Sequence, residues 1–163
     1  MNVTFKGNPL DLQGTEIRVG QKAPDFTAAN KDLSAFKLSE VKGRKLIVSV
    51  PSLDTPVCDA EVRRFNTEAT ALANTTVITI SMDLPFAQAR WCGAAGVDKL
   101  VTVSDYKDHD FAKKYGTFLP ALGLLTRAVF LLAEDNTVLY VEYVPEVTHH
   151  PDYAAVLAAA KKA

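Results

Sequence analysis

The chain has 163 residues, of which 48% are hydrophobic, and its 18 basic and 19 acidic side chains give a net charge of -1. This composition suits one domain, residues 1–163, that buries roughly 70% of the surface exposed by its unfolded chain. Because no strongly basic stretch is present, the charge balance argues against binding to nucleic acid or acidic membranes. Any substrate must therefore be recognised by a local pocket.

The N-terminus and the two cysteines indicate the compartment. Residues 1–14 lack the basic start and apolar run of a secretory signal, and no apolar stretch approaches the roughly 20 residues of a membrane span. These features predict a cytoplasmic protein. Cys58 and Cys92 are too few for a disulfide scaffold, and a permanent bridge is unexpected in a reducing compartment. If they pair, the pairing belongs to transient chemistry.

The N-terminal part of the chain predicts a small hairpin and then a buried strand. The hairpin turns at residues 7–9 and ends near Gly14, and an extended piece over 17–19 and an irregular stretch over 20–26 follow. Residues 45–50 are an apolar run of strand length. Pro51 ends this run, as its missing N–H suits the end of a central strand.

A helix is predicted after this strand, because apolar residues recur there at steps of three and four. The apolar stripe consists of Val62, Phe65, Ala69 and Leu72, and the residues expected on the polar face are Glu61, Arg63, Arg64 and Glu68. Thr55 supplies a capping residue and Pro56 a proline at the first helical position. Cys58 therefore lies in the first turn.

The rest of the chain alternates strands and helices and closes with a hairpin and a helix. The predicted strands are 76–82, 100–104, 128–132 and 138–141, and the predicted helices are 85–95, 108–115 and a last one from about residue 152. This order predicts an α/β fold of thioredoxin-like type, with a mixed central sheet flanked by helices and an N-terminal β-hairpin.

The position of Cys58 favours a reactive thiol. A thiol at a helix start faces unpaired backbone N–H groups and the positive end of the helix dipole, which favour the thiolate. Thr55, three residues earlier, can donate its hydroxyl to the sulfur or accept from a substrate. The alternative is that Cys58 is a small buried apolar side chain, and the spacing alone leaves both interpretations open.

The stretch from Pro51 to Cys58, with the sequence PSLDTPVC, fits the P-x-x-x-T-x-x-C signature and resembles the peroxiredoxins. Its continuation DAEVRRFN is similar to the bacterial thiol peroxidase branch, which are atypical two-cysteine peroxiredoxins. The likeness extends to residues 23–26, 89–93 and 127–130 and so covers nearly the entire chain.

The resemblance implies a role for each site residue. Cys58 would be the peroxidatic cysteine, Cys92 the resolving cysteine, and Thr55 and Arg127 the groups that activate Cys58 and bind substrate together with Pro51. A guanidinium has five donors in a planar fork, so Arg127 can hold a thiolate and a peroxide oxygen together. Without the resemblance, Arg127 would be interpreted as a solvated strand end, and Cys92 as a core residue beside Trp91.

The implied activity is the reduction of hydrogen peroxide and of alkyl or lipid hydroperoxides, and this chemistry requires no metal or organic cofactor. Because Cys92 is predicted inside a helix, we expect local unwinding before a Cys58–Cys92 disulfide forms. The resemblance implies thioredoxin as the reductant and a homodimer, for which the apolar stretch 119–124 is a candidate face. A non-catalytic redox sensor or holdase-like protein on the same fold is the alternative.

The three histidines, His109, His149 and His150, are the remaining candidates for chemistry. Structural zinc takes about four ligands, and adjacent side chains point in different directions on a strand or helix. We therefore expect His149 and His150 to lie in a solvated loop rather than in a metal site.

Overall fold

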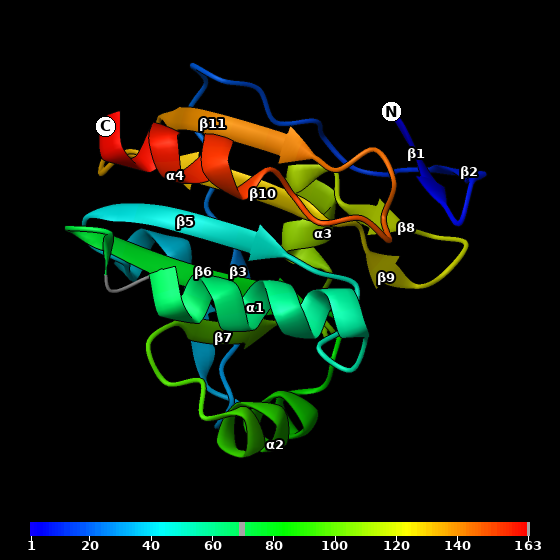
Figure 1. Cartoon of the computed structure of the whole chain (residues 1–163), viewed down its shortest axis with the longest axis horizontal. Coiled ribbons are helices and arrows are strands. Elements are labelled where there is room, and N and C mark those ends of the chain that lie inside the picture. Colours follow the sequence, from blue (N-terminus) through cyan, green and yellow to red (C-terminus); the bar gives the residue numbers. More distant parts are fainter. Residues whose placement is uncertain (69–70, 163) are drawn as a thin grey trace.

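The computed structural model describes residues 1–68 and 71–162 and is built around a seven-stranded mixed sheet (Figure 1). The strands lie in the order β11-β10-β5-β6-β7-β3-β4. Their bounds, in that order, are Val138–Tyr143, Ala128–Leu132, Arg44–Ser49, Thr75–Ser81, Val101–Ser104, Thr27–Ala29 and Ala35–Lys37. β5, β6 and β7 are parallel, and the other neighbouring pairs are antiparallel. This arrangement confirms the predicted thioredoxin-like sheet.

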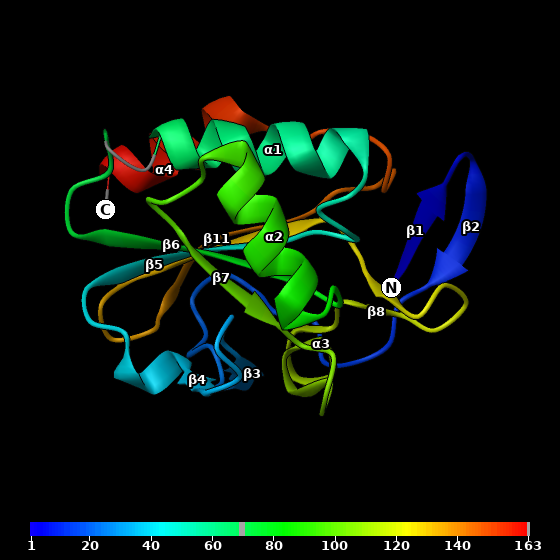
Figure 2. The same cartoon turned by 90° about the horizontal axis from the view of Figure 1, so that it is seen from below.

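Helices cover both faces of the sheet. α1 and α4 lie on one face and α3 lies on the other, while α2 packs against β7 (Figure 2). The bounds are Pro56–Glu68 for α1, Pro85–Ala95 for α2, Asp110–Tyr115 for α3 and Tyr153–Lys162 for α4, and Leu38–Glu40 form one 3₁₀ turn, η1. α2 has the predicted bounds, and the others lie within a few residues of the predicted ones where they can be compared.

Each face of the sheet has its own apolar core because the strand residues alternate in direction. In β5, Leu46 and Val48 pack beneath α1 and α4 with Val62 and Phe65, whereas Ile47 packs on the opposite face, beneath α3. Leu72 of the predicted helical stripe is also buried but lies in a bend outside α1, which corrects the prediction, and Ala69 lies outside the described residues. Burial of this kind is worth roughly 25 cal/mol per Å² of apolar surface.

The N-terminal hairpin is present, but its turn lies at residues 6–7 instead of the predicted 7–9, and it ends at Asp11 instead of near Gly14. β1 (Asn2–Phe5) pairs with β2 (Asn8–Asp11), and the turn consists of Lys6 and Gly7. Both turn residues have positive φ, 50° and 80°, as a two-residue turn that follows the twist of the strands requires. Pro9 tolerates a strand position here because the hairpin is only two-stranded, so its missing N–H breaks no central ladder.

Two further differences concern short elements. Residues 17–19 do not form a strand, and the hairpin of β3 and β4 was not predicted. With three residues each, these two strands show too little alternation to be found from the sequence. The apolar stretch 119–124 also folds back on itself, as β8 (Phe118–Leu119) pairs with β9 (Leu124–Leu125).

Candidate active site

The edge of the sheet at which β5 ends and β10 begins carries the predicted site. β10 runs antiparallel to β5 with Ala128 opposite Ser49, so Arg127 lies beside the chain that leaves β5 toward α1. The loop between β5 and α1 is held by Asp83, which lies just after the end of β6. Asp83 accepts hydrogen bonds from the Ser52 hydroxyl at 2.7 Å and from the Leu53 N–H at 2.8 Å.

Cys58 lies in the first turn of α1, as predicted, and its side chain is completely buried. Its sulfur is packed among apolar side chains, which matches the burial expected for an inert cysteine, but it also has a charged partner. Arg127 Nη2 donates to Cys58 Sγ over 3.2 Å. This contact distinguishes Cys58 from an apolar filler, because a guanidinium donor 3.2 Å from a sulfur favours the thiolate form over the thiol.

Arg127 is itself buried, with 2% of its surface exposed, and its three nitrogens Nε, Nη1 and Nη2 each donate a hydrogen bond. Nε donates to the Val147 carbonyl oxygen at 2.9 Å, and Nη1 forms a short ion pair with Glu61. Burial lowers the pKa of Arg127, but the neighbouring Glu61 carboxyl and Cys58 sulfur raise it by more, and the net shift is upward. Arg127 therefore stays a cation and holds a fixed orientation, since α1 binds it through Cys58 and Glu61 and the segment after β11 binds it through Val147.

Glu61 corrects the sequence prediction, which placed it on the polar face of the helix. It is fully buried, one turn after Cys58 and on the same face, next to the apolar stripe. Burial raises the pKa of Glu61 to about 7, and the Arg127 cation counteracts part of that rise. Its Oε1 atom has no hydrogen-bond partner among the described residues. The spacing of three between Cys58 and Glu61 was the only sequence signal that could have identified this residue.

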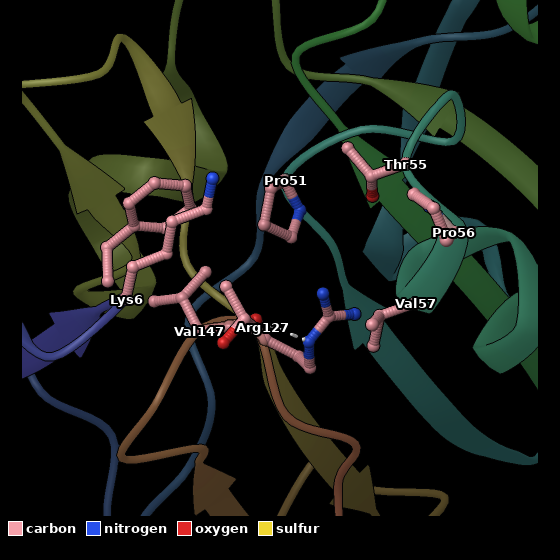
Figure 3. A pocket seen from close by; sticks show the side chains of 9 residues that line it. Lys6, Pro51, Thr55, Pro56, Val57, Arg127 and Val147 are labelled. Atoms are coloured by element: carbon pink, nitrogen blue, oxygen red, sulfur yellow. Dashed lines mark hydrogen bonds between the residues drawn. The ribbon is translucent and has the colours of Figure 1, made fainter.

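Thr55 and Pro51 lie at the mouth of the site. They line a cavity of about 270 Å³ together with residues on three other segments, and Arg127 forms part of its wall (Figure 3). The Thr55 hydroxyl donates to the Ser52 carbonyl oxygen at 2.9 Å. A hydroxyl has one proton, so the predicted donation from Thr55 to the Cys58 sulfur is wrong in this structure. Its oxygen can still accept a hydrogen bond from a molecule in the cavity.

Cys92 lies in α2 as predicted and is 5% exposed. Its sulfur lies 3.4 Å from the Thr102 hydroxyl oxygen, and both cysteines are free thiols. The residues next to the two cysteines are hydrogen-bonded to each other: the indole N–H of Trp91, which precedes Cys92, donates over 2.8 Å to a carboxylate oxygen of Asp59, which follows Cys58. Arg63, paired with Asp59, adds a 3.4 Å hydrogen bond to the Ala95 carbonyl oxygen at the end of α2.

His149 and His150 are exposed and lie in a loop, as predicted, directly after the cavity-lining residue Thr148. His109 precedes α3, and His150 Nδ1 lies 2.7 Å from the Tyr153 hydroxyl oxygen. Within residues 1–68 and 71–162, no three His, Cys, Asp or Glu side chains are grouped as metal ligands. None of the helices in these ranges has the length and apolar character needed to span a bilayer.

A buried cysteine at a helix start, held by an arginine that immediately precedes a strand of a thioredoxin-like sheet, is typical of the class of thiol-dependent redox proteins. Comparison with known proteins agrees, since residues 18–157 match the family model described as Redoxin. The chain belongs to the redoxin family, and its relatives place it among the peroxiredoxins of thiol peroxidase type.

Two relatives and one solved structure illustrate this placement. Thiol peroxidase from Oceanobacillus iheyensis is 54% identical, covering 96% of each chain. Thiol peroxidase from Bacillus subtilis is 52% identical, covering 98% of this chain and 96% of the relative. The crystal structure of a peroxiredoxin-like protein from Aquifex aeolicus is 39% identical, with a TM-score of 0.93 over 99% of this chain and 96% of that one.

Proposed function

We propose that this peroxiredoxin-type peroxidase reduces hydrogen peroxide and organic hydroperoxides at Cys58, and that a Cys58–Cys92 disulfide is the intermediate that a thioredoxin reduces. The 3.2 Å contact from the Arg127 guanidinium to the Cys58 sulfur is the observation that supports this most strongly. The contact stabilises a thiolate, which is the nucleophilic form of cysteine.

In the first step, the thiolate attacks one peroxide oxygen and the O–O bond breaks. Cys58 becomes a sulfenic acid, and the leaving alkoxide or hydroxide takes a proton to become an alcohol or water. Negative charge moves from the sulfur to the leaving oxygen during this step. Arg127 and the N–H groups at the start of α1 are fixed donors for that charge, so they need no reorganisation. Because Cys58 is completely buried, the peroxide reaches it only when the floor of the cavity opens.

In the second step, the Cys92 sulfur attacks the sulfenic sulfur, a disulfide forms and water leaves. A disulfide requires Cα atoms within about 7 Å, which two cysteines held in separate helices do not readily reach. The hydrogen bonds from Trp91 to Asp59 and from Arg63 to Ala95 keep both helices in place. We therefore propose that the adjoining turns of α1 and α2 unwind before the bond closes. A dithiol reductant such as thioredoxin then restores both thiols.

The alternative is a redox sensor or holdase-like protein that is oxidised once and does not turn over. A steady-state assay with cumene hydroperoxide, thioredoxin and its reductase distinguishes the two. Continuous turnover by the wild type, abolished in Cys58→Ser, supports the peroxidase. In Cys92→Ser we expect oxidation in the first step but no efficient recycling. A single stoichiometric oxidation without turnover would refute catalysis, and full activity in Cys58→Ser would refute the role of Cys58.

A homodimer and a cytoplasmic location stay predictions. In the stretch 119–124, Leu119 is buried and residues 120–123 are exposed, with Leu122 38% exposed, so only part of the stretch is available to a partner. Light scattering coupled to size-exclusion chromatography at micromolar concentration tests the dimer, and a monomer there would contradict it.

A further inference from the structure

One wall of the cavity is formed by two segments far apart in the sequence. Phe5 and Lys6 come from the end of β1 and its turn, whereas Val147 and Thr148 follow β11. In Figure 3, Lys6 and Val147 lie across the cavity from Thr55 and Pro56. An isolated two-stranded hairpin is marginally stable in water, so this wall needs a separate attachment to the body of the protein.

The side chain of Glu146 provides that attachment. Its carboxylate accepts hydrogen bonds from the Lys6 N–H at 2.8 Å, the Gly7 N–H at 3.1 Å and the Thr4 hydroxyl. It also accepts from Thr148, through the hydroxyl at 2.7 Å and the N–H at 3.3 Å. The positive φ values of Lys6 and Gly7 turn two successive N–H groups toward one carboxylate, which is an anion-binding arrangement of the backbone. These bonds hold the pKa of Glu146 well below its ordinary value.

Backbone bonds on either side of Glu146 set the register of the two segments. The Thr4 N–H donates to the Pro145 carbonyl oxygen, and the Val147 N–H donates to the Thr4 carbonyl oxygen, each at 2.8 Å. The Val147 carbonyl oxygen then accepts from Arg127 Nε. Residues 145–147 therefore bind the hairpin through Thr4 and bind the site through Arg127.

We propose that Glu146 is a positioning residue that holds the hairpin as the wall of the hydroperoxide cavity, and that this wall sets the preference for bulky over small hydroperoxides. The inference rests on the proposed function at Cys58. Phe5, Val57 and Val147 give the cavity apolar surface for an organic group, whereas hydrogen peroxide has no such group to place there. Cys58 and Glu61 bind Arg127 from α1, which is not part of this wall, so we expect the chemical step to be retained when the wall loosens.

The test compares three variants of the full chain with the wild type: Glu146→Gln, Phe5→Ala and, as a matched control, Asp135→Asn. Asp135 is an exposed carboxylate that accepts from the Thr137 N–H and pairs with Lys22, and it does not line the cavity. Steady-state kinetics with thioredoxin are measured for cumene hydroperoxide and for hydrogen peroxide. In Glu146→Gln and Phe5→Ala we expect KM for cumene hydroperoxide to rise about tenfold with kcat unchanged, and hydrogen peroxide kinetics to stay within about twofold. Asp135→Asn should match the wild type.

Wild-type KM for cumene hydroperoxide in Glu146→Gln, or an equal loss with both peroxides, would overturn the proposal. Amide hydrogen exchange gives a readout that does not depend on activity. The Lys6 and Gly7 amides should exchange at least about tenfold faster in Glu146→Gln, because an NH₂ donor replaces one of the two acceptor oxygens and the other oxygen is no longer charged. If the wild type turned over neither peroxide, the proposed function would fail, and unchanged exchange at Lys6 and Gly7 would separately overturn the role of Glu146.

Discussion

Replacing Arg127 with lysine keeps a positive charge and removes the planar fork of donors. Arg127 donates simultaneously to Cys58 at 3.2 Å, to Val147 at 2.9 Å and to Glu61. A single ammonium cannot satisfy three acceptors in these directions. Losing one oriented donor to developing charge typically costs about 10²- to 10³-fold in rate. We therefore expect Arg127→Lys to slow the reaction with cumene hydroperoxide by about 10²-fold.

The first step is isolated by measuring it in a Cys92→Ser background, where no disulfide can form. Stopped-flow fluorescence of Trp91, the only tryptophan, follows oxidation of Cys58 nearby. Circular dichroism must show that the variant is folded, since removing the partner of a buried charge such as Glu61 costs about 3–5 kcal/mol. Arg127→Gln paired with Glu61→Gln removes both charges and serves as a second comparison. A folded Arg127→Lys that reacts within about twofold of its background would refute the role given to the guanidinium fork.

Three further predictions concern the neighbours of this contact. The pKa of Glu61 is raised from 4.5 to about 7, so the folded state holds this proton more tightly than the unfolded chain. The contribution of this proton to the free energy of unfolding is complete below pH 4.5 and is lost as the pH rises through about 7. In urea titrations over this range, the free energy of unfolding of the wild type should fall by up to about 3 kcal/mol relative to that of Glu61→Gln. Parallel pH profiles of the two proteins would contradict this prediction. Trp91→Phe removes the hydrogen bond to Asp59, so disulfide closure, followed by quenched thiol counting, should accelerate about fivefold, and a slower closure would argue against unwinding. Thr55→Val removes the acceptor at the cavity while keeping the shape, and its hydroperoxide rate constant should fall about tenfold; an unchanged constant would exclude the hydroxyl from substrate binding.

Much of the fold could be predicted because its elements carry strong local patterns. β5 is a continuous apolar run ended by Pro51, and α2 begins with a proline and ends before Gly96, which has a φ of 67°. The short strands β3 and β4 lack such a pattern, because three residues can be read as strand or as loop. Their existence depends on pairing with β7, a tertiary contact.

Part of the site could also be predicted, because some of its residues lie on a local sequence pattern. Cys58 and Thr55 lie on one local motif, and the family resemblance pointed to Arg127. Glu61 was missed because a glutamate on a helix is usually solvated, and only the packing of Arg127 against α1 shows that it is buried. The attachment of the hairpin by Glu146 joins residues more than 130 positions apart, for example Lys6 and Glu146 with a separation of 140, which no local pattern indicates.

The account depends on Cys58 being the sulfur that attacks the peroxide. Mass spectrometry of Cys92→Ser after one equivalent of cumene hydroperoxide, with the sulfenic acid trapped by dimedone, tests this directly. We predict a single adduct on Cys58 that forms much more slowly when Arg127 is lysine. In the wild type the same treatment should give a Cys58–Cys92 disulfide instead. If Cys58→Ser instead gave a dimedone adduct on Cys92 as fast as the wild type is oxidised, the account would be contradicted.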